Sequence, residues 1–377
     1  MDFASLMNVP FGYLLPFIIA ITIIVFVHEY GHFKVARLCG VKVDVFSIGF
    51  GREIFGWNDS HGTRWKVCWI PLGGYVKFEG DANAASMPDT NTQLPRGTGN
   101  FHSKPVWQRA AVVAAGPIAN FILAIFIFTV AFATIGIPYS EPRVDEIIAG
   151  SSAESAGLKP GDYIRKVDGQ ETISFSAVQE FVWQRGGEQL TIVVERGGGL
   201  LELSLTPRVE EMPDGFGGKI KVGLLGVRHN PTTDKPLYQT FSVPQAFVKA
   251  VDRTWYIVAT TGRYVGKLFT GDESVKQIGG PVAIAKGAGD TASSGVLAFV
   301  SFVALLSVSI GLINLFPVPM LDGGHLVYYA LEAIRGKPLG AGAQEWGYRI
   351  GFSFVVMLML IGIWNDIVRT VNVVLGI

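Results

Sequence analysis

Long uncharged apolar stretches constrain this chain more than any other feature of its sequence. Three stretches, at residues 9–27, 110–140 and 291–321, contain no Asp, Glu, Lys or Arg. About 20 apolar residues in a helix are enough to cross a bilayer. A fourth stretch, from about residue 350 to 375, is interrupted by two charges. The sequence therefore predicts an α-helical multi-pass membrane protein with about four spans.

The charge content agrees with this prediction. Charged residues make up 16% of the chain, whereas about a quarter is usual for a soluble domain. The net charge is zero and the basic residues form no dense run, so no nucleic-acid partner is expected. No Lys or Arg precedes the first stretch and no small-residue cleavage site follows it, which favours a retained anchor over a signal peptide.

The positions of Lys and Arg predict the orientation in the membrane. These residues gather after the first span, at 34–77, and between the last two spans, at 335–349. Because basic residues favour the cytoplasmic side, residues 38–109 and 323–349 are expected there, and the N-terminus and residues 139–296 outside. Cys39 and Cys68 then face a reducing compartment, so two free thiols are expected.

Residues 41–80 read as strands, because they alternate and are rich in aromatic and β-branched types. One interpretation is a small cytoplasmic sheet. The other is a membrane-associated β-hairpin that packs beside the spans, since side chains such as Phe46, Trp65 and Trp69 are very apolar for a wet sheet. The polar run from Asp81 to Asn100 reads as a flexible loop.

Residues 141–208 read as a separate soluble α/β unit. Their order of strands, turns and one helix fits a PDZ domain, and the string AGLKPGDYIRKVDGQ at 156–170 resembles the signature of PDZ domains in bacterial envelope proteases. Residues 241–268 alternate charges and aromatics at helical spacing. They predict an amphipathic helix on the outer membrane surface, with a core-packing helix as the alternative.

The string HEYGH in the first span carries the strongest chemical signal. His28 and His32 lie one helical turn apart, so both imidazoles share one face, and neutral imidazole is a good zinc ligand. Glu29 is one step round the helix, where it can act on a water molecule as general base. Ionisable residues inside a span are costly and usually functional.

A catalytic zinc site needs a third protein ligand. The first and third spans run in the same direction, and the third ends in NLFPVPMLDGG, which brings Asp322 to a depth comparable to that of the histidines. Two prolines break the helix there and two glycines free the backbone afterwards. Asp322 is therefore the predicted third ligand, with His325 as a competing candidate.

These motifs together resemble the site-2 protease family of intramembrane zinc metalloproteases. The resemblance includes SIGFG and PLGGYVKF in the strand segment, AAGPIAN in the second span, the PDZ unit and IGGPVAIA at 278–285. Within the family, the chain looks like the bacterial regulator-of-sigma-E protease group. That group often has two PDZ domains in tandem, whereas only one fits between the second and third spans here.

The resemblance implies a function and a site. His28, His32 and Asp322 match the family's zinc ligands and Glu29 its catalytic glutamate. Asn314 matches an asparagine that binds the substrate backbone; the alternative is a helix-end cap or a polar contact between helices. Asn120 is left outside the site. The implied reaction is the cleavage of single-span membrane proteins, such as anti-sigma factors, or of remnant signal peptides, in the bacterial inner membrane. A periplasmic site-1 protease would act upstream.

Two other classes of function stay open. A zinc transporter also places His and Asp in its spans, but has no use for the glutamate of HEYGH or for a PDZ unit. A catalytically inactive PDZ scaffold needs neither Glu29 nor Asp322. The predicted division of the chain is a first span (1–38), a β region and loop (39–105), a second span (106–140), a PDZ domain (141–208), a periplasmic linker with the amphipathic helix (209–290), a third span (291–325), and a cytoplasmic loop with the fourth span (326–377).

Overall fold

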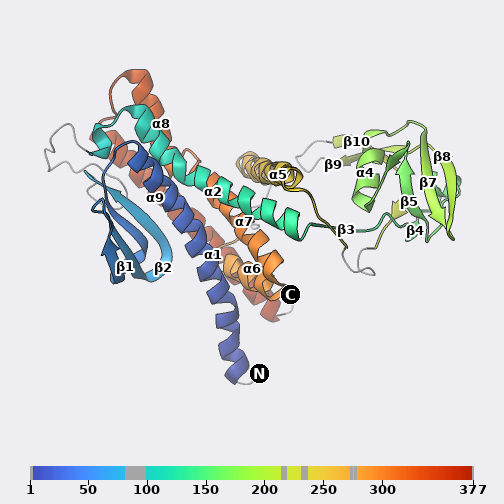
Figure 1. Cartoon of the computed structure of the whole chain (residues 1–377), viewed down its shortest axis with the longest axis horizontal. Coiled ribbons are helices and arrows are strands. Elements are labelled where there is room, and N and C mark those ends of the chain that lie inside the picture. The colour runs from blue at the N-terminus through green and yellow to red at the C-terminus, as the bar shows by residue number, and fades with distance from the viewer. Residues whose placement is uncertain are drawn as a thin grey trace. The chain divides into compact units, whose positions relative to one another are not determined.

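The computed structural model describes residues 3–80, 99–213, 219–230, 237–271, 275 and 278–375. It divides into two compact units (Figure 1). The helical unit contains residues 1–130, 247–268 and 273–377, and the PDZ-type unit contains Ala131–Ala246 with Phe269–Asp272. Each unit has its own core and is described by itself.

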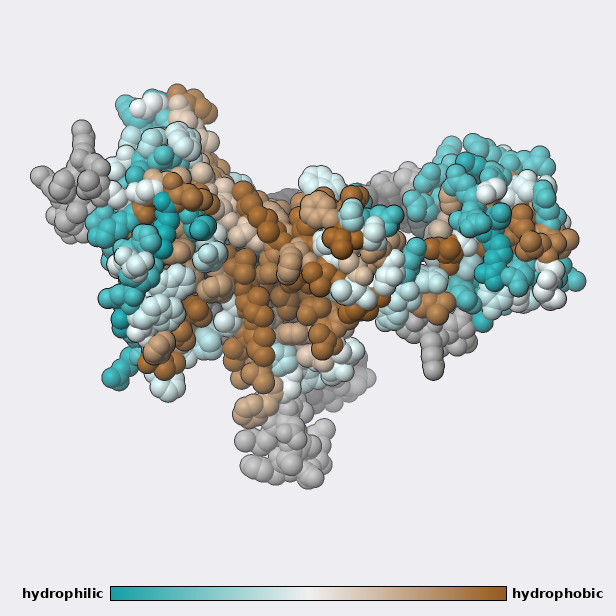
Figure 2. Space-filling view, in the orientation of Figure 1, coloured by the Kyte–Doolittle hydropathy of each residue, from teal (hydrophilic) through white to brown (hydrophobic). Residues whose placement is uncertain are grey.

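Four helices in the described residues are long and apolar enough to cross a membrane. They are α1 (Phe3–Leu38), α2 (Val106–Thr134), α7 (Val296–Asn314) and α9 (Ala341–Leu375). Hydrophobic side chains gather over the helices of this unit in the face shown in Figure 2. By length and composition the four predicted spans are present, and the chain has the character of a multi-pass membrane protein.

The third span ends earlier than the sequence predicted. Helix α7 stops at Asn314, not at residue 321, and α8 (Asp322–Arg335) begins with Asp322 as its first residue. Residues 315–321 form turns, because Pro317 and Pro319 cannot donate the hydrogen bonds that would continue the helix. Asp322 therefore stands at the start of a new amphipathic helix and not at the end of the span.

The predicted β region is a curled hairpin of β1 (Val43–Asn58) and β2 (Arg64–Phe78). Residues 43–48 of β1 pair with residues 74–78 on one side and residues 64–67 on the other, while residues 53–58 pair back onto 64–68. The segment around Phe46 is therefore an inner strand, and Phe46 is fully buried. In the described residues, the segment 74–78 lies at an outer edge of this small sheet.

The hairpin and the span helices share one hydrophobic core. The buried side chains of this core come from α1, the hairpin, the short helix η1 (Phe101–Ser103), α2 and α8. Its members are Phe33, Ala36, Val41, Val43, Phe46, Val76, Phe78, Phe101, Val112, Val113 and Tyr329. The hairpin thus packs against α1, α2 and α8. Both cysteines are free thiols, as expected.

Two further helices complete the helical unit. Helix α5 (Val243–Thr270) covers the segment predicted as an amphipathic helix, and α6 (Pro281–Ser293) packs against α1, α7 and α9. The carboxylate of the buried Asp366, on α9, accepts hydrogen bonds from the backbone N–H groups of Gly280, Val282 and Ala283 at 3.0–3.1 Å. This carboxylate satisfies donors at the start of α6, which a helix leaves without partners of its own.

The PDZ-type unit is built on a four-stranded antiparallel sheet in the order β6-β5-β7-β8. Its elements are β3 (Ile137–Tyr139), β4 (Glu146–Ile147), α3 (Ser152–Ser155), β5 (Tyr163–Val167), β6 (Gln170–Glu171), α4 (Phe175–Gln184), β7 (Leu190–Arg196), β8 (Gly199–Leu205), β9 (Arg208–Pro213), β10 (Lys219–Leu224), β11 (Val227–Arg228) and β12 (Leu237–Gln239). Buried Val178 and Val182 of α4 join Ile164 and Ile192 of the sheet in its core.

This unit extends beyond residues 141–208. Strand β11 pairs with β4, and β12 pairs with β3. Leu225, which follows β10, is buried in the same core as Val144 and Val178. The chain after residue 208 therefore returns to complete the unit.

Candidate metal centre and active site

Helix α1 presents two imidazoles toward one point. His28 and His32 are four residues apart, and both are buried, with 8% and 9% of their surface exposed. Their Nε2 atoms lie 3.2 Å apart. The helix places the two rings on one face because four residues make about one turn.

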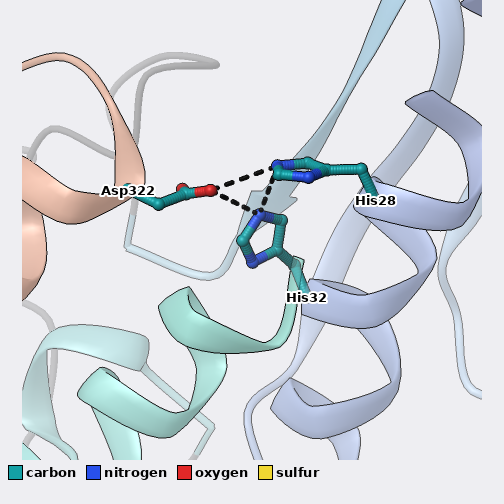
Figure 3. Close-up of side chains that lie close together, drawn as sticks. All are labelled: His28, His32 and Asp322. Atoms are coloured by element: carbon teal, nitrogen blue, oxygen red, sulfur yellow. Dashed lines mark hydrogen bonds and ion pairs between the residues drawn. The ribbon is translucent and has the colours of Figure 1, made fainter. Parts of the chain in front are cut away.

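The first residue of α8 completes the group. Asp322 Oδ2 lies 3.1 Å from His28 Nε2 and 3.5 Å from His32 Nε2 (Figure 3). In the described part of the chain, these three residues form the cluster of His, Cys, Asp and Glu side chains that could hold a metal ion. Residues predicted from two distant motifs therefore come together.

The spacing of the three atoms fits a tetrahedral zinc site. Ligand atoms about 2.0 Å from a tetrahedral zinc ion lie about 3.3 Å from one another. The three separations here, 3.1, 3.2 and 3.5 Å, agree with that value. Two imidazoles and one carboxylate are also a donor set typical of catalytic zinc, which keeps a further position open.

Helix α2 holds the other nitrogen of each imidazole. His32 Nδ1 lies 2.9 Å from the carbonyl oxygen of Val112, so this nitrogen donates and Nε2 keeps its lone pair for a metal. His28 Nδ1 lies 3.3 Å from the side-chain Nδ2 of Asn120, and Asn120 Oδ1 has no hydrogen-bond partner among the described residues. The amide orientation that turns Oδ1 toward His28 gives this second Nδ1–H its acceptor.

A glycine between these two contacts makes room for the rings. A Cβ atom on Gly116 would lie 2.3 Å from His32 Nε2 and 2.9 Å from His28 Cε1, so any larger residue would collide with the site. Val112, Gly116 and Asn120 follow one another at intervals of four and therefore share one face of α2. The sequence reasoning left this face outside the site, although the spacing within AAGPIAN was a signal for it.

A cavity of about 230 Å³ adjoins the three ligand atoms. Glu29 and Asn314 line it together with the three candidate ligands, so the structure brings all five predicted site residues together. Glu29 accepts a hydrogen bond from the backbone N–H of Val76, in the outer strand segment of the hairpin. His325 lines the same cavity but is not part of the ligand cluster.

The backbone near this cavity is strained at one position. Met320, which lines the cavity, has a φ of 97°, a conformation that side-chain-bearing residues rarely adopt. It lies in the turn between α7 and α8, directly before the helix that carries Asp322. Such strain is concentrated at functional sites, where the surrounding structure enforces it.

Comparisons with known proteins agree with this geometry. The profile of Peptidase family M50 matches residues 16–358. A protein of Agrobacterium fabrum whose name classes it as a zinc metalloprotease is 46% identical over 360 residues, which cover 94% of this chain and 96% of the relative. Metalloprotease MmpA of Caulobacter vibrioides is 40% identical, with 94% and 95% of the two chains covered.

A more distant relative and one solved structure are also similar to parts of this chain. The regulator of sigma E protease of Salmonella typhi is 33% identical over 451 residues, with 94% of this chain and 98% of the relative covered. Among solved structures, the PDZ domain of the SdrC-like protein of Listeria monocytogenes aligns with 25% of this chain and 90% of that chain, at 16% identity and a TM-score of 0.19. The family profile and these relatives span almost the whole chain: it belongs to peptidase family M50, the site-2 protease family, and is a zinc metalloprotease.

Proposed function

We propose that this protein cleaves single-span membrane proteins inside or beside the bilayer, with zinc held by His28, His32 and Asp322 and with Glu29 as general base. The observation that supports this most is the convergence of the three ligand atoms at separations of 3.1–3.5 Å beside Glu29, on helices apolar enough to span a membrane. When bound, zinc would supply Lewis-acid polarisation of a carbonyl group and would lower the pKa of a water molecule.

The protein's own residues divide the remaining work. Glu29 takes a proton from the attacking water and returns it to the amine that leaves when the C–N bond breaks. The N–H of Val76 orients the carboxylate for this transfer. Asn314 lines the cavity. Its side-chain amide has both a donor and an acceptor, and it binds the backbone of the unwound substrate.

The outer strand segment 74–78 offers a way to hold that substrate. Gly74, Tyr75 and Val76 line the cavity, and the segment lies at an edge of the hairpin sheet. A substrate helix hides its carbonyl groups in its own hydrogen bonds, so it has to be extended before cleavage, and an added strand on this edge keeps it extended.

The biological setting is part of the same proposal. The chain lies in a bacterial inner membrane, with the N-terminus and the PDZ-type unit in the periplasm and the active site toward the cytoplasm, as the distribution of Lys and Arg indicates. Its substrates are anti-sigma factors or remnant signal peptides that a periplasmic site-1 protease has already trimmed. The likeness to a regulator of sigma E protease supports this choice of substrates.

Two variants of the full-length protein test the chemistry. Glu29→Gln should keep zinc and lose cleavage, because the amide cannot accept the proton, whereas a zinc transporter would be little affected. Asp322→Asn should lose most of the zinc and all cleavage, because it removes the charge that balances the ion. Zinc content is measured by elemental analysis and cleavage by the release of a labelled fragment from a single-span polypeptide. Cleavage by Glu29→Gln, or full zinc occupancy in Asp322→Asn, would contradict the assignment.

The same Glu29→Gln protein also identifies substrates. Membrane proteins that accumulate in cells carrying this variant, measured by mass spectrometry, are expected to be single-span proteins or short remnants without their outer domains. An accumulation of multi-span proteins only would contradict the proposed substrate class.

A further inference from the structure

The turn directly before the third candidate ligand has an unusual backbone. The N–H of Leu321 donates to the carbonyl oxygen of Val318 at 3.0 Å and closes a β-turn. Pro319 and Met320 occupy its two central positions, and Met320 has a φ of 97°. A proline followed by a positive φ is typical of a type II turn, whose third position is normally glycine. Asp322 begins α8 directly after this turn, so the conformation of the turn sets where its carboxylate lies.

Two glycines enclose Pro319, the residue that precedes Met320. From α8, a Cβ atom on Gly324 would lie 2.7 Å from Pro319 Cα. From α9, a Cβ atom on Gly351 would overlap the Pro319 carbonyl oxygen and lie 2.6 Å from its carbonyl carbon. A residue with a side chain keeps a positive φ only where its surroundings enforce it. The close contacts on Pro319 identify α8 and α9 as the elements that do so for Met320.

The contact from α9 acts on the bond that matters. The carbonyl group of Pro319 and the nitrogen of Met320 belong to one rigid peptide plane, and the φ of Met320 is the rotation between this plane and the rest of the chain. Gly351 is buried and lies within the fourth candidate span. Gly347, one turn earlier on the same face, would place a Cβ atom 3.6 Å from Pro319 Cγ. A shift of α9 against this turn would therefore change the φ of Met320 and displace Asp322.

We propose that Gly351 is a positioning residue for the metal centre. Its lack of a side chain lets α9 hold the Pro319 carbonyl group where Met320 keeps its positive φ and Asp322 meets the two imidazoles. The fourth span carries none of the candidate ligands, but in this assignment it fixes the approach of one of them. The inference rests on the ligand set of the proposed function and adds to it a second helix that orients the third ligand.

Close helix packing is the alternative role for this glycine. In membranes, glycine lets neighbouring helices approach without any link to a functional site. A methyl group at residue 351 would then lower stability, and zinc affinity would fall no more than for another buried glycine of α9. Gly362 is that matched control, because it is buried and its Cβ atom would lie 3.0 Å from Gly280 Cα, at the start of α6. Gly342 is exposed, with open space around its Cβ position, and controls for the added methyl group itself.

Zinc retention by the full-length protein in competition with a chelator measures the effect. Gly351→Ala should lower zinc affinity by roughly 10- to 100-fold, the usual loss when a group that orients a metal ligand is changed. Gly362→Ala and Gly342→Ala should each change zinc affinity by less than about threefold. Cobalt(II) loaded in place of zinc should have an altered visible spectrum in Gly351→Ala and an unchanged one in the controls, because that spectrum depends on the arrangement of the ligands.

A second substitution separates the turn from overall folding. Met320→Gly allows a positive φ without strain, so the turn no longer needs α9 to enforce it and can absorb the displaced carbonyl group. Added to Gly351→Ala, it should recover at least about threefold of the lost zinc affinity. Added to Gly362→Ala, it should change zinc affinity by less than about threefold.

Several outcomes would overturn the proposal. They are wild-type zinc affinity in Gly351→Ala, equal losses in Gly351→Ala and Gly362→Ala, or no recovery when Met320→Gly is added. A Gly351→Ala protein that folds only together with Met320→Gly would support the proposal, whereas failure to fold in both forms would contradict it. The proposed function is tested apart from residue 351, by zinc in the unmodified protein, its loss in Asp322→Asn and the absence of cleavage by Glu29→Gln.

Discussion

At the scale of single residues, the site depends as much on what holds the imidazoles as on the imidazoles themselves. Asn120 contacts His28 Nδ1, and its own position is fixed by α7, whose Ser307 hydroxyl donates to the Asn120 carbonyl at 2.8 Å. Gly311 of α7 also packs closely against the Asn120 Cβ atom. Helix α7 contains none of the candidate zinc ligands, but through Asn120 it supports His28 of α1.

A substitution of Asn120 tests this support. Asn120→Leu keeps the branched side-chain skeleton but leaves the His28 Nδ1–H without its acceptor. We expect zinc affinity to fall by about 10- to 100-fold, the usual effect of losing a partner of a metal ligand. The measurement is zinc retention in competition with a chelator. Asn314→Leu is the control. Asn314 lines the cavity, and no hydrogen bond or ion pair among the described residues joins it to His28, His32 or Asp322. This variant should retain zinc while cleavage falls. Wild-type zinc affinity in Asn120→Leu would show that Asn120 does not support His28.

At the scale of helices, an ion pair fixes α8 to α2. Arg109 donates to both carboxylate oxygens of Glu332 at 2.6 and 3.1 Å, and its guanidinium lies 4.9 Å from the centre of the Tyr329 ring. Both side chains are largely buried, at 11% and 14% exposure. Because α8 carries Asp322 at its other end, this pair also fixes the direction from which the third ligand enters.

Breaking that pair should weaken stability and metal binding together. Glu332→Gln leaves the Arg109 charge without its counter-ion, at a cost of about 3 kcal/mol. We expect a lower thermal unfolding midpoint in detergent and weaker zinc retention. The double variant Arg109→Glu with Glu332→Arg should recover part of both. The control is Glu345→Gln, which removes an exposed partner of Arg349 and should change stability by less than about 0.5 kcal/mol. If Glu332→Gln and Glu345→Gln lowered the unfolding midpoint equally, the proposed role of the buried pair would be wrong.

Within the PDZ-type unit, a buried carboxylate predicts a local dependence on pH. Asp162 is almost fully buried and accepts two hydrogen bonds from Arg196, at 2.7 and 2.8 Å, and one from the N–H of Lys159. Burial alone would raise its pKa, but these donors and the charge of Arg196 hold the pKa of Asp162 below its ordinary value. The ionised form therefore stabilises the fold fully above about pH 4, and this contribution is lost as the pH falls below that value.

Hydrogen exchange of the full-length protein measures this effect. After correction for the intrinsic rates, amides of β5 and β7 should lose protection as the pH falls below about 4. Asp162→Asn should be less protected at neutral pH and should lose less additional protection on acidification. Glu195→Gln, which alters a more exposed pair with Arg165, is the matched control. The same pH dependence in Asp162→Asn as in the unmodified protein would refute this account.

At the scale of the whole molecule, the PDZ-type unit is an insertion in the helical unit, between α2 and α5. We expect that it can be deleted as one piece. Its entry and exit strands pair with each other, with Ile137 opposite Gln239. Since paired residues of neighbouring strands lie only about 5 Å apart, a short Gly/Ser linker can replace residues 138–238. These bounds follow the folded unit, whereas a deletion of 141–208 would remove β4, the partner of β11, and the core side chains against which Leu225 packs.

This deletion tests the proposed gate. The proposed orientation puts the unit in the periplasm and the zinc site toward the cytoplasm, on opposite sides of a hydrocarbon core about 30 Å thick. The unit then acts on the outer part of a substrate and not on the chemistry. We expect the deletion variant to keep zinc, to cleave a trimmed single-span substrate as before, and to cleave an untrimmed one as well. A folded, zinc-loaded variant that no longer cleaves the trimmed substrate would favour delivery of substrate over gating.

The sequence by itself determined the four long apolar helices and the side chains of the candidate metal centre. Hydropathy is a local property of the chain, so four apolar segments were visible without any knowledge of their packing. The spacing of His28, Glu29 and His32 fixes their arrangement on any helix, and the two prolines before Asp322 marked it as the predicted third ligand. The PDZ-type string and the apolar strands of residues 43–78 were also readable locally.

Only the tertiary structure decided which distant segments support that centre. Asn120 is separated from His28 by 92 residues and Val112 from His32 by 80, and no local pattern specifies such pairings. The same holds for the curled register that makes 74–78, and not the segment around Phe46, the outer strand beside the cavity. The return of β11 and β12 to the PDZ-type unit likewise depends on long-range pairing. Local sequence sets what each segment can form, whereas burial of one shared core sets which segments meet.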